Sequence, residues 1–200
     1  MMERTGMQIR TIDTHFDVRE EGNERRIEGY FAVFGSNYDL FPGASESVDP
    51  HAFDGALGDD IRCLVDHVTH LVLGRNTAGT LTLRADDHGL WASVLINPDD
   101  SDAMNVYARN KRGDVTQGSF GFDILDEEQE IREDGSVHWT IRKVKLYEVS
   151  VVTFPAYKET GVAARKASFD AIQKRQGEAW RAKMLDRLHR AGQNGGNKNA

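Results

Sequence analysis

The segment 79–98 combines two stretches of strand-like sequence with a turn between them. In GTLTLRA (79–85), Leu81 and Leu83 share one face and the threonines share the other, and GLWASVLINP (89–98) follows the turn-like DDHG. Alternation with a period of two is typical of a half-buried strand, and two strands joined by a short polar turn predict a β-hairpin. Strand-like segments dominate the first 160 residues.

Three more segments have strand composition. VHWTI (137–141) alternates after the turn-like EDGS, which is a second hairpin signal. Residues 28–35 and 146–154 are rich in β-branched and aromatic residues and are almost continuously apolar, which predicts strands buried on both faces. The stretch 36–57 has loop composition, and we expect it to carry one short turn of helix.

Two segments have helical signals. Residues 98–113 offer Ser101 or Asp99 as the N-cap, Gly113 as the stop, and an apolar stripe of Met104, Tyr107 and Ala108. Residues 166–190 place apolar side chains near one helical face, namely Phe169, Ile172, Trp180, Met184 and Leu188. These elements predict a β-rich α+β fold with a single closed or nearly closed core, followed by a C-terminal amphipathic helix.

Length and composition limit the classes of protein. A chain of 200 residues corresponds to one domain with an appendage, and no apolar run approaches the length that a membrane helix needs. The N-terminal residues lack the apolar stretch of a signal peptide, so we expect a cytosolic protein that is not secreted. The single cysteine, Cys63, excludes an internal disulfide and a multi-cysteine metal site.

Charge is distributed unevenly along the chain. Residues 1–160 contain 16 Lys and Arg against 29 Asp and Glu, whereas residues 161–200 contain nine against three. An acidic body argues against a general nucleic-acid-binding protein. The basic C-terminal segment has two interpretations, a solvated helix face or an arm that docks on an acidic partner.

One serine has an unusual setting for a nucleophile. In TQGSFGFDI (116–124), Phe120 and Phe122 point to one face of a strand, while Ser119 and Gly121 point to the other. Glycines beside a hydroxyl let another backbone approach it closely, although they could equally relieve crowding at a bend. Cys63 lies in an apolar strand and is more typical of a small core residue than of a catalytic thiol.

A serine nucleophile needs a base, and the sequence contains seven histidines. Four of them, His15, His88, His138 and His189, lie in polar or turn-like surroundings and are expected at the surface. His67 and His70 lie in CLVDHVTHLVLGR, where apolar residues surround a polar cluster. His67 is the candidate base, and a metal cluster of Asp66, His67 and His70 is the alternative. Strand spacing would place the two histidines on opposite faces, so no metal is predicted.

A third residue usually orients the base, and Glu148 is the candidate. It is the one charged residue in the apolar strand LYEVSVV, where a carboxylate is rarely buried without a partner. Ser150 shares its face. The alternative is an ion pair of Glu148 with Arg142, Lys143 or Lys145.

Six segments, in this order and with these gaps, resemble the prohead maturation proteases of tailed DNA phages. They are IEGYFAVF (27–34), SVDPHAF (47–53), VDH…LVLG (65–74), GL (89–90), QGSFGF (117–122) and LYEVSVVTFPAY (146–157). The resemblance implies that His67 and Ser119 are the catalytic pair. The family is regarded as distantly similar to herpesvirus assemblins, which have a β-barrel core ringed by helices and use a second histidine. The resemblance therefore implies a herpesvirus-protease-like fold, with a barrel-like core and flanking helices. No further histidine here lies in a family motif, so Glu148 is the expected third member.

The resemblance also implies a function. It predicts a serine endopeptidase that cleaves the scaffold, the major capsid protein and itself inside the procapsid, in the host cytoplasm, without a metal or other cofactor. We also expect a homo-oligomer. The lack of a membrane-length apolar run and the acidic body predict no membrane partner and no specific nucleic acid. The alternatives are an inactive capsid or tail assembly module of the same fold, or a hydrolase of small acyl substrates. The expected domains are a catalytic domain, 1–163, and a basic helical arm, 164–200, which either recruits the enzyme into the shell or closes an edge of the barrel.

Overall fold

The computed structural model describes residues 7–154 and 159–195, with side chains for 7–154 and 165–190. The chain divides into two compact units, Met1–Gly161 and Val162–Ala200. The first unit contains all the described strands, the short 3-10 helix η1 (Asn76–Ala78) and helix α1, and the second contains most of helix α2.

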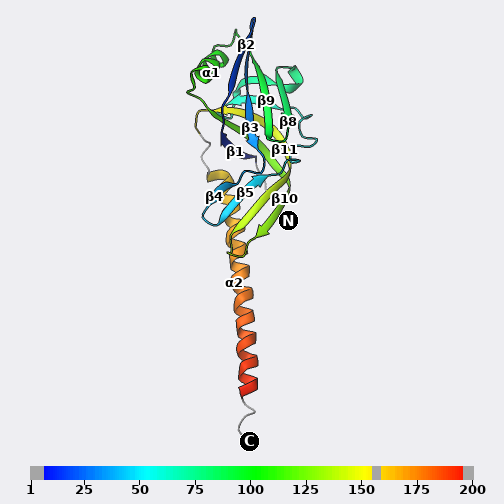
Figure 1. Cartoon of the computed structure of the whole chain (residues 1–200), viewed down its shortest axis with the longest axis vertical. Coiled ribbons are helices and arrows are strands. Elements are labelled where there is room, and N and C mark those ends of the chain that lie inside the picture. Colours follow the sequence, from blue (N-terminus) through cyan, green and yellow to red (C-terminus); the bar gives the residue numbers. More distant parts are fainter. Residues whose placement is uncertain (1–6, 155–158, 196–200) are drawn as a thin grey trace. The chain divides into compact units, whose positions relative to one another are not determined.

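The first unit contains a seven-stranded sheet whose centre is the pair β10 and β11. These are the two longest strands, and they run antiparallel to each other (Figure 1). The order is β1-β10-β11-β5-β4, and the hairpin of β6 and β7 joins through β6 to β11. The strands are β1 (Gln8–Asp13), β4 (Tyr38–Phe41), β5 (Ala44–Val48), β6 (Arg62–Val65), β7 (Val68–Arg75), β10 (Gln117–Ile131) and β11 (Val137–Val152).

Strand β11 has two different parallel neighbours along its length. Its first part pairs with β5 and its second part pairs with β6. The segments 137–141 and 146–154, predicted as separate strands, therefore belong largely to one continuous strand. The hairpin predicted from EDGS is confirmed, because residues 132–136 connect β10 to β11.

A second sheet has four strands in the order β2-β3-β9-β8, all antiparallel to their neighbours. Its strands are β2 (Asp17–Glu21), β3 (Glu24–Val33), β8 (Leu81–Ala85) and β9 (Gly89–Ile96). The hairpin predicted from 79–98 is confirmed as β8 and β9. The two sheets share one apolar core, to which Ile27, Phe31 and Val94 contribute from one sheet and Phe120 and Val149 from the other.

The described strands do not close into a barrel, contrary to the expectation from the resemblance. The strand-rich α+β class is confirmed, since two sheets and few helices make up the described residues. The stretch 36–57 was predicted as a loop, but it contains the hairpin of β4 and β5. All five residues of β5, ASESV, are buried. Their small and polar side chains lack the apolar alternation by which a strand is recognised.

The N-cap of helix α1 (Ser101–Arg112) lies one residue away from either predicted cap, Asp99 or Ser101. Asp100 is the N-cap, and its Oδ1 accepts hydrogen bonds from the backbone N–H groups of Asp102 and Ala103. Gly113 ends the helix in the left-handed conformation, as predicted. The buried face differs from the predicted stripe and consists of Ala103, Val106, Tyr107 and Asn110.

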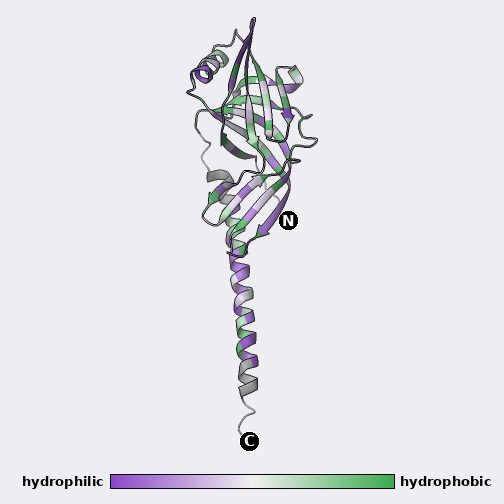
Figure 2. Ribbon diagram, in the orientation of Figure 1, coloured by the Kyte–Doolittle hydropathy of each residue, from purple (hydrophilic) through white to green (hydrophobic). Residues whose placement is uncertain are grey.

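In the second unit, helix α2 (Glu159–Gly195) continues beyond both ends of the predicted 166–190 helix. Figure 2 shows that hydrophilic residues dominate it, with single apolar residues between them. Trp180, Leu185 and Leu188 are exposed. Despite its length, α2 is too polar to cross a bilayer, and no other helix in the described residues meets the requirements of a membrane span.

Candidate active site

A β-bulge in β11 decides which way Glu148 points. Gly121 of β10 lies opposite Glu148, but the next residue, Phe122, lies opposite Leu146, so Tyr147 is an extra residue in β11. Without the bulge, Leu146 and Glu148 would share a face, because they are two residues apart. The bulge keeps Leu146 in the core and turns Glu148 to the opposite face of the sheet.

Gly121 provides the space that the Glu148 carboxylate occupies. A Cβ atom at Gly121 would clash with Oε1 of Glu148 and would lie 3.0 Å from Sδ of Met7. At Gly118, a Cβ would lie 2.8 Å from the carbonyl oxygen of Tyr30 in β3. The two glycines around Ser119 therefore have different roles: one makes room for a carboxylate, and the other allows the close approach of another backbone.

His67 is presented by a tight turn between β6 and β7. Asp66 and His67 are the only described non-glycine residues with positive φ, at 49° and 61°. A two-residue hairpin turn with two positive φ values matches the twist of the flanking strands, and strained backbone of this kind often accompanies functional sites. The Asp66 carboxylate accepts hydrogen bonds from N–H and Oγ1 of Thr153, at 2.7 Å and 2.9 Å, and so anchors the turn to the end of β11.

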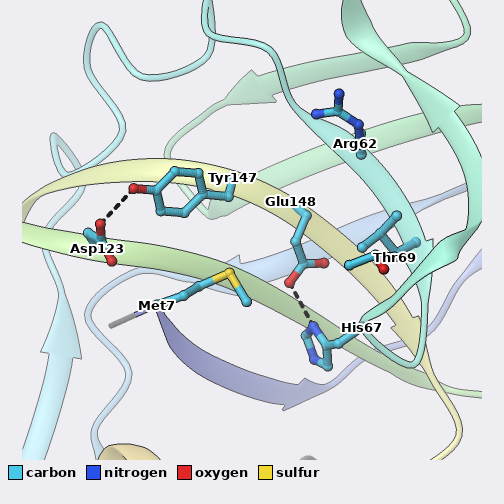
Figure 3. Close-up of a pocket in the computed structure, with 8 residues that line it drawn as sticks. Met7, Arg62, His67, Thr69, Asp123, Tyr147 and Glu148 are labelled. Atoms are coloured by element: carbon cyan, nitrogen blue, oxygen red, sulfur yellow. Dashed lines mark hydrogen bonds and ion pairs between the residues drawn. The ribbon is translucent and has the colours of Figure 1, made fainter. Parts of the chain in front are cut away.

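The structure brings His67 and Glu148 together. His67 Nδ1 lies 2.6 Å from Oε1 of Glu148 (Figure 3). Ser150 Oγ donates to Oε2 of the same carboxylate at 2.5 Å. Glu148 is 4% exposed, so its carboxylate is held among these partners in a setting of low dielectric. Glu148 therefore pairs with His67, and the alternative interpretation, an ion pair with Arg142, Lys143 or Lys145, is wrong.

The Glu148 contact also selects one tautomer of the neutral imidazole. With Nδ1–H directed at the carboxylate, the neutral ring carries its lone pair on Nε2. Nε2 of His67 is buried and has no hydrogen-bond partner among the described residues. A nitrogen in this state can accept a proton from a hydroxyl that reaches it.

Ser119 lies on the same face of β10 as Gly121, opposite Ser150 of β11 and Thr11 of β1. Its side chain has no exposed surface. Its Oγ donates to the carbonyl oxygen of Arg10 at 2.9 Å and accepts from Thr11 Oγ1 at 3.1 Å. Within the described part of the chain, no hydrogen bond joins Ser119 to His67. The hydroxyl is therefore engaged by β1 in this structure.

A pocket of about 480 Å³ opens beside His67 and Glu148. Figure 3 shows its lining, which includes Met7, Thr69 and Tyr147. Tyr147, the extra residue of the bulge, donates its hydroxyl to Asp123 at 2.6 Å. This hydrogen bond to a carboxylate raises the pKa of Tyr147, so the phenol stays protonated at neutral pH.

The remaining candidates, Cys63 and a metal cluster of Asp66, His67 and His70, have other surroundings or partners. Cys63 is fully buried in the core, and burial raises the pKa of its thiol, which agrees with a packing role. In the described residues, no group of three His, Cys, Asp or Glu side chains is arranged to hold a metal ion. The Asp66 carboxylate binds Thr153 and His67 binds Glu148, so these two side chains do not converge on a common ligand.

The expectation that His138 lies at the surface was wrong. It is 8% exposed, and its ring nitrogens lie 2.8 Å from Ser45 Oγ and 2.9 Å from Ser47 Oγ on the neighbouring strand β5. Burial lowers the pKa of His138. Its partners come from the stretch 36–57, which lacks the strand signal that would place it beside β11. His15, His88 and His189 are exposed, as predicted.

A buried carboxylate that orients a histidine, on a sheet whose same face carries a buried serine, is the set of side chains that serine hydrolases use. Residues 14–175 match the sequence family described as the caudovirus prohead serine proteases. The chain belongs to this family, which confirms the prediction from the six motifs and makes the protein a serine protease of phage procapsid maturation.

One sequence relative agrees with this assignment, and one solved structure shares the fold. The chain is 29% identical over 161 residues to the prohead protease of Enterobacteria phage HK97, covering 80% of this chain and 68% of the relative. The fold is similar to that of the bacteriophage T4 capsid assembly protease, with a TM-score of 0.50 at 10% identity, over 74% of this chain and 98% of the other.

Proposed function

We propose that Ser119, His67 and Glu148 are the nucleophile, the general base and the orienting carboxylate of this protease. The observation that carries the proposal is the 2.6 Å contact between His67 Nδ1 and Glu148, together with the buried, unpartnered Nε2. Ser119 shares the sheet face on which Glu148 lies and is the one residue of the three that is engaged elsewhere, by β1.

The mechanism follows from these roles. His67 Nε2 takes the hydroxyl proton of Ser119 as Oγ forms a bond to the carbonyl carbon of the substrate. The C–N bond then breaks, His67 returns the proton to the leaving amine, and a water molecule hydrolyses the acyl-enzyme by the reverse proton path. Glu148 stabilises the imidazolium that forms in both steps and keeps the ring in the required tautomer. None of these steps calls for a metal or another cofactor.

The substrates we propose are the major capsid protein, the scaffold and the protease itself, cut inside the procapsid in the host cell. The names of the two relatives support this class of substrate. We also propose a homo-oligomer that has no specific nucleic-acid partner. The acidic catalytic body, with 29 Asp and Glu against 16 Lys and Arg in residues 1–160, supports the second part.

Two structural proposals accompany the function. The catalytic domain comprises residues 1–163, and residues 164–200 form a basic arm that recruits the enzyme into the assembling shell. The exposed Trp180, Leu185 and Leu188 of α2 support a docking role. The distant relationship to herpesvirus assemblins stays a prediction, which a structural superposition centred on His67 and Ser119 would test.

The experiment is co-expression with the major capsid protein of the same phage, followed by intact-mass analysis of both proteins. We expect the wild type to process the capsid protein, and Ser119→Ala and His67→Ala to stop processing while keeping the melting temperature near that of the wild type. Loss of either member of such a pair costs several orders of magnitude in rate. The matched control is Ser101→Ala at an exposed position of α1, which should process normally. Processing by a folded Ser119→Ala protein would exclude the serine mechanism.

A further inference from the structure

Strand β1 occupies the edge of β10 beside Ser119. It pairs antiparallel with β10 from Gln117 to Phe122 and pairs with no other strand in the described part of the chain. Thr11 lies directly opposite Ser119. If β1 were absent, this part of β10 would present a row of free backbone donors and acceptors, which is the surface that binds an extended peptide as an added strand.

Two residues of β1 form hydrogen bonds with the hydroxyl of the proposed nucleophile, Ser119. Ser119 Oγ lies 2.9 Å from the carbonyl oxygen of Arg10, and Thr11 Oγ1 donates to it at 3.1 Å. The hydroxyl proton of Ser119 therefore points at a carbonyl oxygen and not at a base. In this arrangement the hydroxyl is not activated for attack. Because Ser119 has no exposed surface, a substrate carbonyl reaches it only after β1 has left.

The side chain of Arg10 forms an ion pair with the buried carboxylate of Glu46. Its Nε and Nη2 donate to the two oxygens of Glu46, at 2.5 Å and 3.1 Å, and Glu46 has no exposed surface. The guanidinium also lies 5.7 Å from the centre of the Phe122 ring. A bidentate pair with a carboxylate is strong and directional, and a buried carboxylate that loses its cation strongly destabilises the fold. Glu46 therefore favours a basic side chain at this position of any strand that pairs with β10.

We propose that β1 is an intramolecular stand-in for the substrate strand, and that the true substrate is an extended peptide with a basic residue in the place of Arg10. This inference rests on the proposed function, because it takes Ser119 as the nucleophile. In the resting enzyme, β1 covers Ser119, and its Arg10 side chain pairs with Glu46. Activity requires exchange: β1 leaves β10, a substrate segment pairs in the same register, and its carbonyl at the Arg10 position meets Ser119.

A reversible lock on β1 tests this exchange. Asp13 lies opposite Gln117 at the end of the ladder, and Gln117 Nε2 donates to Asp13 Oδ1 at 2.8 Å. Cysteines at both positions, Asp13→Cys and Gln117→Cys, would tie β1 to β10 when oxidised and free it when reduced. The native Cys63 is fully buried and does not compete for the new disulfide. The matched control is Asp13→Ser with Gln117→Ser under the same redox conditions.

The readout is the labelling rate with a fluorophosphonate, measured by intact mass. Ser119 Oγ forms a bond to phosphorus, fluoride leaves, and the hydroxyl proton goes to His67. We expect the oxidised protein to react at least about tenfold more slowly than the reduced one, since a locked strand depletes the open state. The serine control should show no redox dependence. Equal rates in the two redox states would overturn the proposal.

A second measurement does not depend on the catalytic assignment. Hydrogen exchange on the wild-type chain should show faster exchange for the amides of Gln8–Asp13 than for those of β3, because β1 must open while the core sheet stays closed. Exchange of β1 as slow as that of β3 would overturn the proposal. If the reduced protein is labelled at a residue other than Ser119, the nucleophile in the proposed function is wrong, and the exchange measurement still decides whether β1 leaves β10.

Discussion

His67 and Glu148 are 81 residues apart in the chain, and their side chains meet at 2.6 Å. Two local irregularities make the contact possible. The turn at Asp66 and His67 has positive φ at both residues, and the bulge at Tyr147 turns Glu148 away from the core. At both positions the backbone departs from regular strand geometry beside the candidate active site. Bulges and strained backbone tend to occur at such sites.

Replacing Glu148 with glutamine should lower the rate and keep the fold. A neutral amide stabilises the imidazolium poorly and does not select the tautomer, so we expect a loss of about 10²–10⁴-fold in kcat. The measurement is capsid-protein cleavage by the purified variant, with a thermal melt alongside. Glu130→Gln at an exposed position of β10 is the matched control. A loss below about tenfold would make Glu148 a structural residue.

A methyl group at Gly121 should damage catalysis through Glu148. Its Cβ would overlap Oε1 of the carboxylate, so Gly121→Ala should cost about 1–3 kcal/mol in stability and reduce kcat at least about tenfold. Gly58→Ala, where a Cβ meets no atom within 4 Å, is the control. In a Glu148→Ala background, Gly121→Ala should have little additional effect on kcat. An equal loss in both backgrounds would show that the glycine acts by another route.

Asp66 should position His67 through the turn. Asp66→Ala removes the two hydrogen bonds to Thr153 and places a residue with a poor tolerance for positive φ at 49°. We expect a loss of about 1–3 kcal/mol in stability, and a fall in kcat with KM nearly unchanged. Asp66→Asn, which tolerates this conformation and retains an acceptor, should restore kcat. Failure of the asparagine variant to do so would contradict a positioning role.

Buried His138 should make the fold sensitive to acid. Burial holds its pKa below that of the unfolded chain, about 6.5, so the unfolded state binds more protons between the two values. This contribution to stability is present above about pH 6.5 and is lost as pH falls through the lower folded-state pKa. Melting temperatures from pH 7.5 to 5 should therefore fall more steeply for the wild type than for His138→Gln. Parallel curves would refute the assignment.

Truncation after Ala164 should separate catalysis from recruitment. We expect the shortened protein to cleave soluble capsid protein at a rate close to that of the full chain and to be lost from procapsids, because the exposed apolar residues of α2 are removed. The two measurements are cleavage of purified capsid protein and the protease content of isolated procapsids. An insoluble or unfolded truncation product would instead assign the helix to the core of the catalytic domain.

Strand alternation, helix signals and motif order were enough to predict the β8–β9 and β10–β11 hairpins, the two helices and the catalytic candidates. These features are local, because the alternation of a strand and the cap of a helix depend on residues that are close together in the sequence. The lone charge of Glu148 in an apolar strand and the glycines around Ser119 were also visible in the sequence. The bulge had a signal that was missed: the core residues Val144 and Leu146 are followed by Val149 and Val151, a shift of one residue in the alternation.

Only the tertiary structure decided which strands pair across long stretches of sequence and which side chains come into contact. The polar strand β5 has no apolar pattern, yet its pairing with β11 buries His138 against Ser45 and Ser47. The pairing of β1 with β10 places Arg10 and Thr11 on the hydroxyl of Ser119, and nothing in residues 8–13 alone indicates it. Partners in a sheet are far apart in the chain, and their choice depends on the packing of the whole core rather than on the preferences of either strand.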